Sequence, residues 1–428
     1  MKIGKVGFLV LTVLLLNWSL SSAWFGDKQR KKSIIPAETT SSWVLNRAGA
    51  AGSSIVFPVH GNVYPIGSYN VTLNMGQPPR PYFLDVDTGS DLTWLQCDAP
   101  CSHCSETPHP LYRPSNDLVA CRDPLCASLQ PSDDYRCDHP EQCDYEIEYA
   151  DHYSTLGVLV RDIFLLNFTN GNQLKVRMAL GCGYDQIFPA SSYHPLDGIL
   201  GLGRGKSSLI SQLSSQGLVR NVVGHCLSVH GGGYIFFGDL HDYSRVTWTP
   251  MSPYYSKYSP EVAELIVGGR ATGVGNLVTI FDTGSSYTYF NSKAYQALVS
   301  WLEKELSGKP LKEAPEDRNL DRCWRGRKPF KSVRDVRKYF KPVALNFPSG
   351  GRAKAQFEIP PEAYLIISNK GNVCLGILNG SEVGMEDLNL IGDISMQDKV
   401  MVYDNEKQLI GWAPANCDRI PRSRDVSF

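Results

Sequence analysis

A short motif that occurs twice in this chain decides its fold. Residues 83–90 read Phe-Leu-Asp-Val-Asp-Thr-Gly-Ser, and residues 278–285 read Val-Thr-Ile-Phe-Asp-Thr-Gly-Ser. In each copy an apolar run leads into Asp-Thr-Gly, which predicts a buried strand that enters a tight turn. A single Asp-Thr-Gly is an ordinary strand-ending turn, because Asp and Gly both favour turns. The second copy is what indicates a duplicated structure.

Each copy of the motif is followed by a matching anchor of two apolar residues and a glycine. Ile199-Leu200-Gly201 ends 114 residues after Asp87, and Leu390-Ile391-Gly392 ends 110 residues after Asp282. Two pairs of landmarks at nearly equal spacing are typical of an internal repeat. The sequence therefore predicts two homologous lobes related by an approximate twofold axis.

The rest of the chain reads as a β protein. Short β-branched and aromatic runs alternate with Gly, Pro and Asn, as at residues 68–75, 145–149 and 234–237. Two helices are predicted, one between Lys206 and Gly217 and one that begins at Asn291 or Ser292. We expect an all-β, bilobal fold with a few short helices, an N-terminal lobe at residues 54–245 and a C-terminal lobe at residues 246–417.

Asp87 and Asp282 are the candidate reactive groups. A twofold relation between the lobes brings these two carboxyl groups to the axis, close enough to share one proton. Because like charges at that separation cannot both ionise easily, the pKa of one group rises and that of the other falls. One group then activates a water molecule as general base while the other protonates a peptide carbonyl as general acid. This chemistry needs no metal and no cofactor, and we expect neither.

The other residues of the two motifs are assigned supporting roles. The glycines allow tight turns with exposed amides, the serines are placed to hydrogen-bond the aspartate of their own lobe, and the threonines are placed to cross-link the two loops. These residues are Thr88, Gly89, Ser90, Thr283, Gly284 and Ser285.

The N-terminal end of the chain is typical of a secreted protein. A basic start and an apolar run from Val6 to Leu16 precede small residues, which predicts a signal peptide at residues 1–23. The run is shorter than the ~20 residues that a membrane span needs, so no membrane anchor is expected. Residues 24–53 are interpreted as a basic leader or pro-segment, and residues 418–428 as a polar tail.

The 12 cysteines are expected to form six disulfides, because the predicted compartment is oxidising. Seven of them lie in residues 97–143, which we interpret as an insertion stapled by disulfides. The Cys-x-x-Cys run at 101–104 also matches a zinc or redox pair, but no second such pair follows, so structural disulfides are favoured. The cysteines are Cys97, Cys101, Cys104, Cys121, Cys126, Cys137, Cys143, Cys182, Cys226, Cys323, Cys374 and Cys417.

Several other functional classes find little support. With 42 Lys+Arg and 43 Asp+Glu, the formal net charge of −1 indicates no nucleic-acid partner. The glycine-rich run at 201–207 resembles a phosphate-binding loop, but position 200 is Leu where that motif needs Gly. Neither Gly-x-Ser-x-Gly nor His-Glu-x-x-His occurs, which argues against serine hydrolases and zinc peptidases. Asn167 is the preferred glycosylation site, since its sequon reads as a turn.

The two Asp-Thr-Gly-Ser copies, their anchors and the run at 145–151 resemble the pepsin-like aspartic proteases, in particular the plant nucellin-like and nepenthesin-like branch with its cysteine-rich insertion. The resemblance spans residues 60–417. It implies that Tyr149 is the tyrosine of a mobile hairpin, the flap, which closes over bound peptide, and that Trp94 steadies this tyrosine. At the flap tip the chain departs from the family pattern, because His152 and Tyr153 stand where the family has a glycine.

The resemblance also implies a function and two disulfides. The expected function is an aspartic endopeptidase with an acidic pH optimum, a monomer that acts on extended peptides or proteins in an extracellular or vacuolar compartment. Cys226 is expected to pair with Cys417, and Cys323 with Cys374. Some plant relatives on this fold are inhibitors that have lost a catalytic aspartate. A weakly active or inactive binding protein is therefore the alternative, although this chain keeps both aspartates.

Overall fold

The structure is a computed structural model of the chain. It describes residues 54–99, 101–130, 137–150, 152–187, 196–240, 243–318, 320–348 and 355–420. The predicted signal peptide and leader, and residues 421–428 of the predicted tail, lie outside the described residues. All described residues belong to one structural unit.

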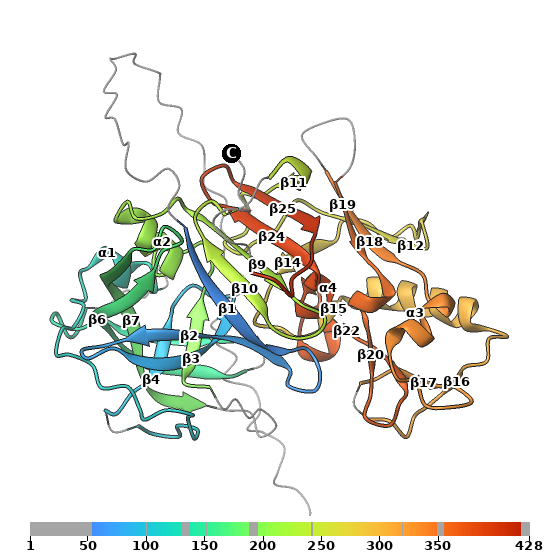
Figure 1. Cartoon of the computed structure of the whole chain (residues 1–428), viewed down its shortest axis with the longest axis horizontal. Helices are drawn as coiled ribbons and strands as arrows, with labels where there is room; N and C mark the ends of the chain where they lie inside the picture. Colours follow the sequence, from blue (N-terminus) through green and yellow to red (C-terminus); the bar gives the residue numbers. More distant parts are fainter. Residues whose placement is uncertain are drawn as a thin grey trace, which may run out of the picture. The chain divides into compact units, whose positions relative to one another are not determined.

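A thirteen-stranded sheet is built by both halves of the chain (Figure 1). Strands β24 and β25, near the C-terminal end, join it because β24 pairs with β9 of the N-terminal half. The sheet therefore connects the two lobes. In order across the sheet, its strands are β11 (Thr247–Pro250), β25 (Leu409–Pro414), β24 (Lys399–Asp404), β9 (Val222–Leu227), β10 (Gly233–Phe237), β1 (Ile55–Asn62), β2 (Ser68–Met75), β3 (Arg80–Asp87), β8 (Gly198–Gly201), β4 (Trp94–Gln96), β7 (Gln173–Ile187), β6 (Ser154–Asn167) and β5 (Asp144–Glu148).

Three four-stranded sheets complete the C-terminal half. The first contains β13 (Arg270–Ala271), β12 (Glu264–Val267), β18 (Val343–Phe347) and β19 (Ala355–Ile359). The second contains β14 (Val278–Phe281), β23 (Leu388–Ile391), β15 (Thr288–Phe290) and β22 (Ile377–Asn379). The third contains β16 (Lys312–Glu313), β17 (Cys323–Arg325), β21 (Val373–Leu375) and β20 (Leu365–Ile367).

The predicted duplication is confirmed by strand pairing. In the N-terminal lobe, β3 runs parallel to β8, so that Asp87 lies opposite Gly201. In the C-terminal lobe, β14 runs parallel to β23, and the Asp282 amide donates to the Ile391 carbonyl at 3.1 Å. Each apolar-apolar-Gly anchor therefore supplies the parallel neighbour of the strand that carries the aspartate. The fold is mostly β and bilobal, as the sequence predicts.

Both predicted helices are present. Helix α2 (Leu209–Ser215) is capped by Ser208, and Gly217 follows it with φ +72°. Helix α3 (Ser292–Leu306) begins at the Asn291 cap, whose side chain accepts from the Ala294 amide at 3.0 Å. The shorter helices are α1 (Pro124–Ala127), α4 (Asp393–Met396), η1 (Tyr243–Arg245), η2 (Val333–Asp335), η3 (Arg337–Tyr339), η4 (Pro361–Ala363) and η5 (Gly380–Val383). Among the described residues no helix has the length and apolarity of a membrane span.

All twelve cysteines are paired, which confirms the prediction of six disulfides. The two pairs implied by the family resemblance, Cys226–Cys417 and Cys323–Cys374, are also confirmed. Four pairs hold the cysteine-rich insertion, and one of them ties it to β7. These four are Cys97–Cys182, Cys101–Cys104, Cys121–Cys137 and Cys126–Cys143. Because Cys101 and Cys104 are bonded to each other, they offer no thiolate ligands, and the zinc interpretation of residues 101–104 is not supported.

Candidate active site

Asp87 and Asp282 occupy equivalent positions at the ends of two strands. Asp87 is the last residue of β3, and Asp282 directly follows β14. Both side chains are nearly buried, with exposed fractions of 5% and 7%. A carboxyl group so withdrawn from water is stable only where hydrogen bonds or a shared proton compensate for lost hydration.

Thr88 and Thr283 cross-link the two aspartate loops. The Thr88 amide donates to Thr283 Oγ1, and the Thr283 amide donates to Thr88 Oγ1, both at 3.0 Å. Each hydroxyl in turn donates into the opposite lobe, Thr88 to the Phe281 carbonyl at 3.0 Å and Thr283 to the Val86 carbonyl at 2.7 Å. Four buried hydrogen bonds thus fix one loop against the other.

Each aspartate also accepts hydrogen bonds from its own loop. Asp87 accepts from the Gly89 amide at 2.7 Å and from the Ser90 hydroxyl. Asp282 accepts from the Gly284 amide at 2.9 Å and from the Ser285 hydroxyl at 3.3 Å. The donors are closer to Asp87, so its environment is better suited to a negative charge.

The glycines of the two loops let the carboxyl groups face each other. A Cβ atom on Gly284 would lie 2.6 Å from Asp87 Oδ1, and one on Gly89 would overlap the Asp282 carboxyl group. Each carboxyl group therefore lies against the loop of the other lobe. Any side chain at either glycine would occupy the space that the opposite aspartate fills.

Charge and burial together favour one proton for the pair. Burial, followed by the charge of Asp87 and a hydrogen bond to it, raises the pKa of Asp282 to about 8. Asp282 therefore holds a proton through the acidic range. The arrangement supplies a proton acceptor and a proton donor side by side, which is the chemical requirement for general acid-base catalysis.

The structure brings together the two residues expected at the flap. Trp94 Nε1 donates to the Tyr149 hydroxyl at 2.8 Å, and Tyr149 directly follows β5. Burial, and then the charge of Asp87, raise the pKa of Tyr149 well above its ordinary value, so its hydroxyl stays protonated. The hairpin of β5 and β6 thus places a neutral hydroxyl near the aspartates.

Tyr153 is a flap contact to which the sequence analysis gave no role. Its ring stacks on Tyr149 with ring centroids 5.3 Å apart, and it lies 5.9 Å from Trp94. Its hydroxyl donates to Gln186 Oε1 at 2.6 Å, and the Tyr149 amide donates to the Tyr153 carbonyl at 2.7 Å. Tyr153, one of the two residues that depart from the family pattern at the flap tip, is therefore buried and packs against the flap tyrosine, Tyr149. Its place across the turn from Tyr149 was the signal that could have revealed it.

Two further carboxyl groups near the pair were also missed. Asp85 precedes Asp87 by two residues on β3, and its Oδ1 is buried without a hydrogen-bond partner among the described residues. Asp393 is 1% exposed, and neither carboxyl oxygen has such a partner. Burial is the main cause that raises the pKa of both groups well above the ordinary value, helped by neighbouring aspartates. The period-two alternation of a strand could have indicated Asp85, since it shares a face with Asp87.

Among the described residues, one group has the ligand geometry of a metal site, Asp317 with Cys323 and Cys374. The two cysteines are bonded to each other, so their sulfur atoms are not thiolate ligands. Asn167, the expected glycosylation site, is exposed at the end of β6.

Comparison with known proteins places this geometry in a family. Residues 69–239 match the family model described as Xylanase inhibitor N-terminal, and residues 264–414 match Xylanase inhibitor C-terminal. The chain is 47% identical over 387 residues to an aspartic proteinase from Oryza sativa subsp. japonica, with 87% of this chain and 94% of the relative covered. It is 29% identical over 398 residues to aspartic proteinase 39 of Arabidopsis thaliana, covering 88% and 80%.

Solved structures show the same fold at low identity. The basic 7S globulin from soybean superposes with a TM-score of 0.66 at 18% identity, covering 86% of this chain and 99% of the globulin. An aspartic proteinase from Irpex lacteus gives a TM-score of 0.61 at 16% identity, covering 86% and 99%. The fold is thus the bilobal pepsin-like fold. By its sequence matches, the chain belongs to the plant pepsin-like aspartic protease family.

Proposed function

We propose that this protein is an aspartic endopeptidase, active at acidic pH, in which Asp87 and Asp282 are the catalytic residues. The observation that carries the proposal is the pairing of two buried carboxyl groups, each against the glycine of the opposite loop, with the pKa of Asp282 raised to about 8. Two negative charges are costly in such a site, so the pair holds one proton over the acidic range.

In the proposed reaction the two aspartates act together on one water molecule and the peptide carbonyl group. Asp87, which receives the closer donors, removes a proton from the water as its oxygen attacks the peptide carbonyl carbon. Asp282 gives its proton to the carbonyl oxygen, which yields a neutral tetrahedral diol. The proton then held by Asp87 passes to the peptide nitrogen, the carbon–nitrogen bond breaks, and Asp282 recovers a proton from the diol.

The surrounding residues position these groups. Thr88 and Thr283 hold the loops at a fixed separation through four hydrogen bonds, so little reorganisation is needed during the reaction. Tyr149, held by Trp94, is proposed to close over an extended peptide or protein substrate. Because the Tyr149 hydroxyl remains neutral, it is available as a hydrogen-bond donor at every pH in the active range.

The test is cleavage of a denatured protein substrate over about pH 3 to 6, with and without pepstatin. The wild-type protein, with its leader removed if latency is seen, is compared with Asp87→Asn and Asp282→Asn. Asp138→Asn, an exposed position in the insertion, is the matched control. We expect pepstatin-sensitive cleavage by wild type and control, and loss of cleavage in both site variants. Full activity in either site variant would exclude the mechanism.

We also propose that the protein enters the secretory pathway, with residues 1–23 as signal peptide and residues 24–53 as a leader that limits activity before removal. The support is the sequence of these residues and the six disulfides, which are consistent with the extracellular or vacuolar location of such proteins. N-terminal sequencing of the mature protein tests the two boundaries. Mass analysis of the peptide that contains Asn167 tests the proposed glycan.

A binding protein without activity is the second candidate. The observation in its favour is that both family models carry the description Xylanase inhibitor. Retention of both aspartates and both loop serines favours catalysis, because a pure binding surface does not need a shared proton. Tight binding of a protein partner that is unaffected by Asp87→Asn, together with no cleavage by wild type, would favour this candidate.

A further inference from the structure

A strongly basic segment lies in the C-terminal lobe, outside the residues assigned to catalysis. Residues 322–341, here called the basic segment, carry nine cationic side chains and one acidic side chain, Asp335, whereas the whole chain has a formal net charge of −1. The cations are Arg322, Arg325, Arg327, Lys328, Lys331, Arg334, Arg337, Lys338 and Lys341. Such a concentration of one sign raises the local concentration of anions.

Three cations of the basic segment, Arg322, Arg325 and Arg337, form ion pairs within the protein. Arg322 lies 3.3 Å from Glu303 and 3.4 Å from Glu313. Similarly, Arg325 pairs with Glu316 at 2.7 Å. Arg337 pairs with Glu362 of η4 at 2.8 Å. These pairs connect the segment to α3, β16 and η4.

The cations in the middle of the basic segment are not paired in this way. In the part of the chain that the structure describes, no carboxylate forms an ion pair with Arg327, Lys328, Lys331 or Arg334. The one acidic side chain of the segment, Asp335, also lines the hollow described below, and its carboxylate accepts from the backbone amides of Lys331 at 2.9 Å and Ser332 at 3.1 Å. It offsets only one of these four positive charges. The centre of the segment therefore presents uncompensated positive charge.

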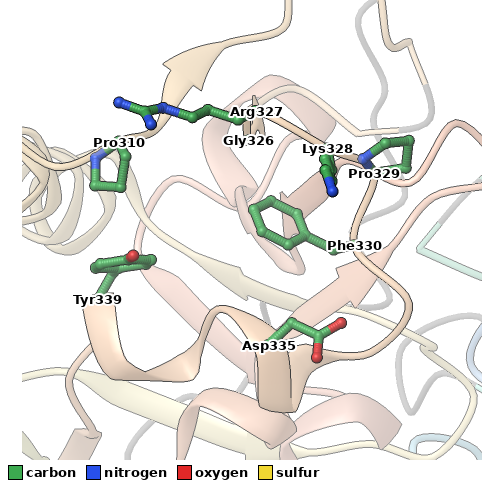
Figure 2. Close-up of a pocket in the computed structure, with 8 residues that line it drawn as sticks. All are labelled: Pro310, Gly326, Arg327, Lys328, Pro329, Phe330, Asp335 and Tyr339. Carbon is green, nitrogen blue, oxygen red and sulfur yellow. The ribbon is translucent and has the colours of Figure 1, made fainter.

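Two of these cations line a hollow of about 510 Å³ together with two aromatic rings. Figure 2 shows Lys328 beside the Phe330 ring, with Arg327 and Tyr339 also around the hollow. The loop of residues 326–330, which follows β17, is held by a hydrogen bond in which the Phe330 amide donates to the Gly371 carbonyl at 2.8 Å. The rings of Phe330 and Tyr339 pack against the core and are partly exposed. None of the residues proposed for catalysis or for the flap lines this hollow.

We propose that the hollow and the neighbouring cations bind an acidic polysaccharide built of uronate sugars. The C–H face of a sugar ring packs on aromatic rings such as those of Phe330 and Tyr339. The uronate carboxylate suits the guanidinium of Arg327, which offers two parallel donors, and the ammonium of Lys328. A polymer repeats both features at each sugar, so the adjacent cations of the basic segment meet successive carboxylates and the contacts reinforce one another.

An acidic peptide shares the carboxylates but lacks the ring faces, and an anionic lipid surface is flat where this site is concave. Both are outcomes of the test. The site is independent of the proposed proteolysis, since it serves to retain the protein on an acidic matrix, whatever the protein does there.

The test is binding of the whole protein to immobilised polygalacturonate at about pH 5, where uronates are ionised, in roughly 0.1 M salt. The probes for comparison are methyl-esterified polygalacturonate, polyglutamate, and vesicles that contain phosphatidylserine. The site variant is Arg327→Gln with Lys328→Gln. The matched control is Arg270→Gln with Lys304→Gln, which removes the same charge from exposed positions of the same lobe.

We expect wild type and control to bind polygalacturonate. The site variant should bind at least about tenfold more weakly, because two charge-assisted contacts are lost. Tyr339→Ala should weaken binding without a change in net charge, and the methyl ester should bind poorly to every variant. Circular dichroism verifies that each variant is folded. Equal loss in site variant and control, or binding of polyglutamate or vesicles as tight as that of polygalacturonate, would overturn the proposal.

Discussion

The substitution Asp282→Asn is predicted to flatten the dependence of stability on pH. Burial and Asp87 raise the pKa of Asp282 from an ordinary 3.8 to about 8 in the folded protein. Below the ordinary value both folded and unfolded states hold the proton. As the pH rises towards 8, the unfolded state loses this proton while the folded state keeps it, so the free energy of unfolding falls through that window.

The magnitude follows from the same two values. Each pKa unit corresponds to about 1.4 kcal/mol, so Asp282 removes roughly 6 kcal/mol of stability between acidic and mildly alkaline pH. This is a large part of the ~5–15 kcal/mol that stabilises a typical domain. The protein should therefore be most stable in acid. Asparagine cannot ionise, so the variant should lose this contribution.

Urea unfolding from about pH 4 to pH 8 measures the effect, with Asp138→Asn as a control that changes an exposed carboxyl group. Wild type and control should lose stability steeply over the range, and Asp282→Asn should lose much less. Part of the slope should remain in the variant, because burial also raises the pKa of Asp85 and Asp393. A variant with the full wild-type slope would refute the reasoning, since the buried proton would then not reside at Asp282.

Three further predictions concern the supporting residues. Thr88→Val should lower the free energy of unfolding by about 2–3 kcal/mol and reduce kcat, since it removes two cross-lobe hydrogen bonds, whereas Thr88→Ser should retain both; urea titration and kinetics distinguish them. Trp94→Phe removes the donor to Tyr149 and should lower kcat/KM about fivefold through KM, with an unchanged circular dichroism spectrum. Gly392→Ala should cost ~1–3 kcal/mol or prevent folding, because its Cβ would overlap the Tyr287 carbonyl, and a normal thermal midpoint would contradict this.

Much of the fold could be predicted because local and repeated signals agreed with it. The run at 68–75 became β2, with alternate residues buried, and Asn291 became the cap of α3, whose side chain accepts from a backbone amide. The repeated motif and its anchors predicted two related lobes, and the structure shows the same parallel pairing of the aspartate strand with the anchor strand in each lobe. These features depend on residues that are near in sequence, or on two copies of one signal.

Other features depend on contacts between distant residues. The thirteen-stranded sheet that joins β24 to β9 has no local signal, because strand pairing is decided by which edges meet after folding. Tyr153 has a role only because the flap turn stacks it on Tyr149, and its hydroxyl reaches Gln186 on another strand. Likewise, Asp393 of α4 is buried near the charges of Asp85, Asp282 and Asp87 only in the folded protein.

The duplication, the candidate aspartates, the number of disulfides and the family resemblance all follow from residue types at fixed spacing along the chain. The burial of the carboxyl groups, the raised pKa of Asp282 and the threonine cross-link between the lobes exist only in the folded protein. The tertiary structure also separated the paired from the unpaired cations of the basic segment. The physical reason is that desolvation and charge pairing depend on distances in space, which spacing along the chain does not give.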